Sequence, residues 1–147
     1  MTKIFLLLCL LYLFQTIQAG FRRVENNRLL QRDKDCILTF SPRNIPSKLP
    51  PFIHNLEING RTPKETIEDL TKIANPADAK NNADNNLGDI KYASPSAGLG
   101  CLGAFVKIYT GANFLGASYT FTLSEPEGTL NLSKYLGEHA SSIKFYY

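Results

Sequence analysis

The sequence predicts one mainly β domain that follows an N-terminal export segment. Its 147 residues are enough for a single apolar core, and a chain of this length is expected to form one domain. The composition, 44% apolar and 20% charged, excludes collagen-like and wholly disordered chains. Residues 103–147 contain four stretches rich in aromatic and β-branched residues, separated by tight turns and lacking a helical pattern. These observations together favour an antiparallel β structure.

The export segment is expected over residues 1–19. Lys3 precedes an apolar run over residues 4–14, which is shorter than the about 20 residues that a spanning helix requires. This length is typical of a secretory signal, and Ala19 supplies a small residue for cleavage. A retained membrane anchor is the alternative. The sequence therefore predicts a secreted, extracellular chain that begins at Gly20 and has no membrane contact after cleavage.

Cleavage of this segment removes Cys9 and leaves Cys36 and Cys101. Two cysteines in an oxidising compartment are most simply one disulfide, which would close a loop of about 65 residues. Two buried thiols are the alternative. A closed zinc site is excluded, because it needs four nitrogen or sulfur ligands.

Residues 20–35 are polar and charged and predict a loosely held arm. In the N-terminal half, residues 36–102, the stretches 37–40 and 52–58 predict strands on either side of a proline-rich segment.

A helix is expected near residues 63–74. Thr62 can cap its N-terminus, Pro63 suits the first helical position, and Glu65 completes a capping box. Apolar residues follow at helical spacing, from Ile67 to Ala74. Residues 75–86, rich in asparagine and aspartate, predict a flexible loop, and residues 89–93 a further strand.

The C-terminal segment, residues 103–147, predicts four strands. They are expected near residues 104–109, 117–123, 129–135 and 141–147, with a turn at residues 125–128.

This segment resembles a Greek-key motif of the βγ-crystallin family. Tyr109, Phe114 and Gly116 have the spacing of the family's folded hairpin, and Ser142 belongs to a serine pair before the closing strand. The resemblance implies a βγ-crystallin-like Greek-key sandwich, here with one inserted helix near 63–74. Because such domains pair two motifs, residues 36–102 form a diverged first motif, or residues 103–147 pack on other structure, or motifs pair between chains.

The resemblance also implies candidate calcium ligands, namely Glu138, Ser141 and Thr110. Gly137 stands where the family has its first acidic or amide ligand. Because calcium prefers six to eight oxygen ligands, including carboxylates, we expect a weak site or none.

Other chemistry has little support in the sequence. His54 and His139 lie in no catalytic motif, so the chain is not expected to be an enzyme. The slight excess of basic residues lies in the arm, which argues against nucleic acid as a partner. Asn131 begins a glycosylation sequon, although the following leucine could instead be a core residue.

The function predicted is that of a non-enzymatic structural or binding protein, whose partner is an unknown extracellular protein or a second copy of the chain. The alternative is a secreted protease inhibitor or toxin-like protein, with the proline-rich residues 41–51 as its protruding loop.

Overall fold

The computed structural model describes residues 35–95, 100–132, 136 and 139–147. The export segment, the polar arm up to residue 34 and the calcium candidate Glu138 lie outside the described residues. No helix of the described residues is long and apolar enough to span a membrane.

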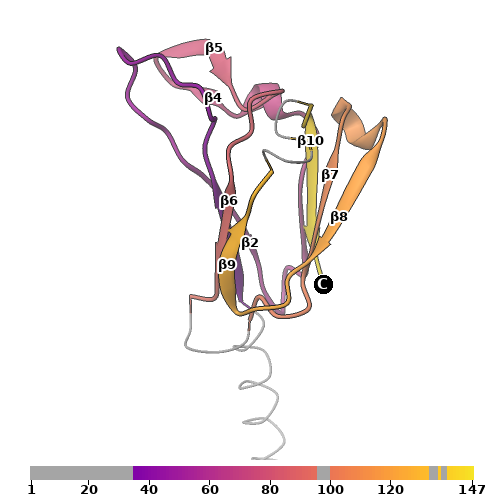
Figure 1. Ribbon diagram of the computed structural model, residues 1–147. Helices are drawn as coiled ribbons and strands as arrows, with labels where there is room; N and C mark the ends of the chain where they lie inside the picture. Colours follow the sequence, from indigo (N-terminus) through magenta and orange to yellow (C-terminus); the bar gives the residue numbers. More distant parts are fainter. Residues whose placement is uncertain (1–34, 96–99, 133–135, 137–138) are drawn as a thin grey trace, which may run out of the picture. The chain divides into compact units, whose positions relative to one another are not determined.

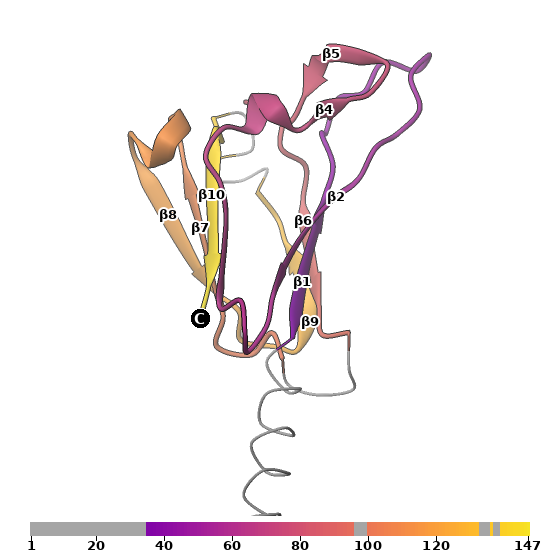
Figure 2. The same cartoon turned by 180° about the vertical axis from the view of Figure 1, so that it is seen from behind.

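Two antiparallel four-stranded sheets and one two-stranded sheet form the described structure (Figure 1). The first sheet has the order β2 (His54–Ile58), β1 (Cys36–Phe40), β6 (Ile90–Ala93), β9 (Glu127–Leu130). The second has the order β3 (Lys64–Ile67), β10 (Ser142–Tyr146), β7 (Phe105–Tyr109), β8 (Ser118–Thr122). Figure 2 shows the two sheets from behind, with β1 and β2 in one and β7 and β10 in the other. The mainly β class is confirmed.

Each sheet takes three strands from one half of the chain and its fourth strand from the other half. β9 from the C-terminal half pairs with β6, and β3 from the N-terminal half pairs with β10. The two halves are thus two Greek-key units that exchange their third strands. Residues 36–102 supply the second unit that a single motif needs to cover its apolar face.

The core lies between the two sheets and follows from the period-two alternation of the strands. In β1, Cys36, Leu38 and Phe40 are buried while the residues between them are partly exposed. Val106 and Ile108 of β7 contribute in the same way to the same apolar cluster.

The prediction of a helix near residues 63–74 is wrong. Lys64–Ile67 is strand β3, and only Leu70–Lys72 forms a single 3-10 turn, capped by Asp69. β3 pairs with β10 over four residues, and these tertiary hydrogen bonds outweigh the local capping signal. Ile67 and Leu70 do reach the core, but through a strand followed by a turn.

The segment predicted to be a flexible loop contains a small hairpin, formed by β4 (Ala74–Asn75) and β5 (Asp78–Asn82). Residues 75–86 contain no apolar side chain larger than alanine. Asn75, however, is itself buried, and its side chain donates a hydrogen bond to Pro50 O. Side-chain hydrogen bonds within and around this segment therefore supply the stabilisation that apolar burial does not provide.

Cys36 and Cys101 form a disulfide with a Cα–Cα distance of 4.7 Å. Both residues are fully buried. The bond joins the start of β1 to the segment before β7, and so links the two Greek-key units directly.

Candidate functional site

The three residues predicted to build the folded hairpin, Tyr109, Phe114 and Gly116, lie at and after the end of β7, and Ser142 of β10 pairs with Tyr109. Figure 1 shows β7 and β10 side by side in the second sheet. The rings of Tyr109 and Phe114 meet edge to face, with centroids 5.5 Å apart. The buried hydroxyl of Ser142 donates to Gly111 O at 2.7 Å and accepts the Phe114 N–H at 3.1 Å. Gly116 has a φ of +78°, a conformation that glycine adopts without strain.

The amino groups of two lysines lie over the rings of Tyr109 and Phe114. This arrangement was not predicted from the sequence. Lys144 Nζ lies 4.1 Å from the centroid of Phe114, and Lys107 Nζ lies 5.2 Å from that of Tyr109. Both are cation–π distances. The signal in the sequence is their alternation with core residues in β7 and β10, which puts lysine on the outer face.

Of the three candidate calcium ligands, Thr110 and Ser141 are among the described residues and Glu138 is not. Thr110 and Ser141 flank the paired ends of β7 and β10, where the Ser141 N–H donates to Tyr109 O. The Thr110 hydroxyl already accepts the Ala117 N–H at 3.0 Å. Two neutral hydroxyls are not a calcium site, and among the described residues no three histidine, cysteine or acidic side chains cluster for a metal.

The proline-rich loop, residues 41–51, is tied to the domain at both ends. Near its start, Asn86 Oδ1 accepts the Asn44 N–H at 2.9 Å, and Asn86 Nδ2 donates to Asn44 O at 3.1 Å. Near its end, the buried Asn75 donates from Nδ2 to Pro50 O at 2.9 Å. Between the ties, residues 46–49 form a turn closed by the Leu49 N–H and Pro46 O. The loop backbone is therefore fixed while Lys48 stays exposed.

Neither tying asparagine was identified from the sequence. Asn75 and Asn86 bound the stretch interpreted as a flexible loop, and the only signal was its high asparagine content. An asparagine amide that bonds both the N–H and the C=O of a distant residue leaves no local pattern.

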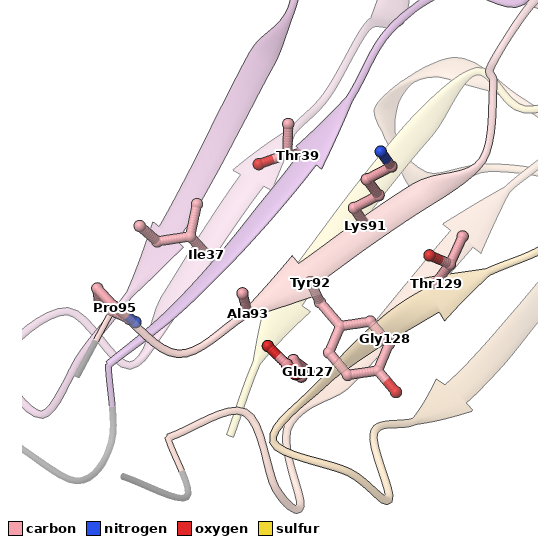
Figure 3. A pocket seen from close by; sticks show the side chains of 9 residues that line it. All are labelled: Ile37, Thr39, Lys91, Tyr92, Ala93, Pro95, Glu127, Gly128 and Thr129. Carbon is pink, nitrogen blue, oxygen red and sulfur yellow. The ribbon is translucent and has the colours of Figure 1, made fainter. Parts of the chain in front are cut away.

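A shallow depression of about 520 Å³ lies on the outer face of the first sheet (Figure 3). Ile37, Thr39, Lys91 and Thr129 project from β1, β6 and β9 on the side opposite the core. Below them the Tyr92 ring fills the space where Gly128 has no side chain. The lining supplies apolar and hydroxyl contacts, the Lys91 ammonium group and the Glu127 carboxylate, which suits a contact surface.

A second depression, of about 570 Å³, lies between β2 and β3 and includes His54 and Asp69. Partial burial lowers the pKa of His54, so the imidazole is neutral at physiological pH. The Thr71 hydroxyl and the Thr71 N–H hold the pKa of Asp69 below its usual value. These bonds make Asp69 the cap of the 3-10 turn, which is a structural role.

The sequon residue Asn131 follows β9 and is exposed, while Leu132 is fully buried in the core. Ser133, the hydroxyl residue of the sequon, lies outside the described residues. The middle residue is thus a core residue, and Asn131 still faces solvent.

No family model matches this sequence, and no curated protein matches it. Among solved structures, the chain is similar to a double mutant of a betagamma-crystallin domain from Clostridium beijerinckii. The identity is 18%, the alignment covers 75% of this chain and 96% of that chain, and the TM-score is 0.34. The strand order of the two sheets shows a Greek-key sandwich. The contacts of Tyr109, Phe114 and Ser142 form the folded corner that the resemblance to the βγ-crystallin family implied.

Proposed function

We propose that the protein is a secreted, non-enzymatic binding module whose recognition element is the proline-rich loop, residues 41–51. Secretion is supported by the N-terminal apolar segment and by the buried Cys36–Cys101 disulfide, since such bonds persist in oxidising compartments.

The observation that carries the binding role is the double attachment of the loop to Asn86 and Asn75. Binding by a flexible segment costs the free energy of ordering it, and a loop already held in one conformation avoids that cost. The exposed residues between the ties, Pro46, Ser47 and Lys48, combine a stiff backbone with one positive charge. Such a surface suits an extracellular protein with an acidic patch.

The test is affinity capture from extracellular fluid with immobilised wild-type protein and three variants. Lys48→Glu changes the charge at the loop tip, and Asn86→Ala releases one tie. Asn55→Ala, at an exposed asparagine of β2, is the matched control. A partner that binds the wild type and Asn55→Ala, and is lost with both loop variants, supports the proposal. A partner that binds all four proteins alike, or no partner at all, contradicts it.

Protease inhibition is the second candidate, because Asn86 fixes both backbone groups of Asn44 in an exposed loop. An inhibitor loop must stay rigid in the protease cleft, so Asn86→Ala should turn an inhibitor into a cleaved substrate. The turn at residues 46–49 argues against an extended, substrate-like conformation around Lys48. Inhibition assays against serine and cysteine proteases decide the question, and a lack of inhibition of every protease tested removes this candidate.

Calcium is proposed as a weak ligand at most. Stabilisation by a ligand follows RT ln(1 + [L]/Kd), which is small when the site has too few ligands and binds weakly. We expect the melting temperature to be nearly the same in millimolar calcium and in chelator. A steep rise of the melting temperature with calcium that Glu138→Ala abolishes would contradict this expectation.

We further propose that Asn131 carries a glycan, and a mass loss on enzymatic deglycosylation of the secreted protein tests this.

A further inference from the structure

Strand β8 differs from the other three outer strands of the two sheets. The edges of the two four-stranded sheets are β2, β9, β3 and β8. β2 contains Glu57, β9 contains Glu127, and β3 contains Lys64 and Glu65. β8, with the sequence SYTFT, has no charged residue, proline or glycine. Proteins usually protect an edge strand with such residues, so β8 is an edge left open to pairing.

The backbone of β8 presents hydrogen-bonding groups outward at every second residue. Residues 117 and 123 use their backbone groups toward the β7 side, since Thr110 N–H donates to Ala117 O and Leu123 N–H donates to Ala104 O. The antiparallel register with β7 runs without interruption between these points. By the alternation of an antiparallel ladder, Ser118, Thr120 and Thr122 therefore point their N–H and C=O groups away from β7. No described strand lies on that side (Figures 1 and 2).

The side chains of β8 are also incompletely covered. Tyr119 lies opposite Ile108 and Phe121 opposite Val106, so both rings are on the core face of the sheet. Ile108 and Val106 are fully buried, whereas Tyr119 is 43% exposed and Phe121 is only partly buried. The apolar face thus extends past the part of the core that the first sheet covers.

We propose that β8 pairs antiparallel with β8 of a second copy of this chain, about a twofold axis through Thr120. In this register Thr120 faces its own equivalent, Tyr119 faces Phe121, and Ser118 faces Thr122. The outward backbone groups of all three hydroxyl residues then meet across the axis. Tyr119 and Phe121 then form aromatic cross-strand pairs across the axis, which are favourable. No charge repels across the axis, because β8 has none. This symmetry of SYTFT about its centre favours a second copy over an unrelated peptide. The inference does not depend on the proposed loop function.

The experiment is sedimentation analysis of the secreted protein over a range of concentrations, with Thr120→Glu as the test variant. In the monomer, a glutamate at this position lies opposite Lys107, which favours folding. Across the twofold axis two glutamates meet and repel. The matched control is Thr129→Glu, at an exposed threonine opposite Lys91 on the outer strand of the other sheet.

We expect dimers for the wild type and for Thr129→Glu, and monomers for Thr120→Glu over the same concentrations. A monomeric wild type, or a Thr120→Glu variant as dimeric as the wild type, overturns the proposal. Loss of dimers in Thr129→Glu also overturns it.

Hydrogen exchange of the wild type supplies a readout that needs no variant. Dimerisation through β8 should slow exchange of the Ser118, Thr120 and Thr122 amides as concentration rises. The amides of Tyr119 and Phe121, already directed toward β7, should not change. Exchange that is independent of concentration at all five residues overturns the proposal even if a variant fails to fold.

Discussion

At the scale of single residues, Gly116 and Gly103 distinguish two energetic costs of adding a side chain, namely backbone strain at positive φ and a steric clash of the Cβ. Both glycines have positive φ, +78° and +83°. A Cβ at Gly116 would lie 2.5 Å from Thr110 Oγ1, whereas nothing lies within 4 Å of a Cβ at Gly103. Gly103→Ala should cost roughly 1 kcal/mol of unfolding free energy, from the left-handed backbone alone. Gly116→Ala should cost about 2–3 kcal/mol, because the clash is added. Urea unfolding measures both, and equal losses would contradict the role given to the Thr110 contact.

Tyr147 gives the protein a dependence on alkaline pH. Burial, and then the negative charge of Asp35, raises the pKa of Tyr147 to about 12 from its ordinary value of 10.0. The folded state therefore holds this proton more tightly, and the stabilisation is complete below pH 10 and is lost as pH rises toward 12. Tyr147→Phe should flatten the fall in unfolding free energy over this interval, as measured by urea unfolding at several pH values. An unchanged slope in the variant would show that other groups cause the fall.

At the scale of one element, Ser142 holds the folded hairpin onto β10. Its buried hydroxyl makes two hydrogen bonds to the hairpin backbone, so Ser142→Ala leaves Gly111 O and the Phe114 N–H without this partner. We expect a loss of about 2 kcal/mol. Ser141→Ala, at the buried neighbouring serine without such bonds to the hairpin, is the control and should lose less than half as much. Chemical denaturation with calcium and with chelator measures both, and similar losses would contradict the assignment.

At the scale of the whole molecule, the disulfide joins the two Greek-key units. Its sequence separation of 65 residues corresponds to about 4 kcal/mol in the chain-entropy model. Replacing both Cys36 and Cys101 by serine should therefore lower the unfolding free energy by roughly 3–4 kcal/mol. Intact mass after alkylation should show no modified cysteine before reduction and two after it. Alkylation of both without reduction would contradict the disulfide.

Several features followed from the sequence alone because their causes are local or chemical. The alternating stretches near residues 37–40, 104–109 and 141–147 became strands β1, β7 and β10 within a residue or two. Period-two burial is encoded within each strand, so no neighbour is needed to recognise it. The disulfide partners followed from counting cysteines.

Only the tertiary structure decided how the two halves combine. The sequence around Pro63 and Glu65 has good helix-start signals, but β10 offers an open edge that pairs with Lys64–Ile67 and makes it β3. The exchange of β3 and β9 between the sheets likewise depends on partners far away in the chain. The ties of Asn86 to Asn44 and of Asn75 to Pro50 span 42 and 25 residues. Such interactions form only when the fold brings distant backbone groups together, so a single sequence contains no local pattern that predicts them.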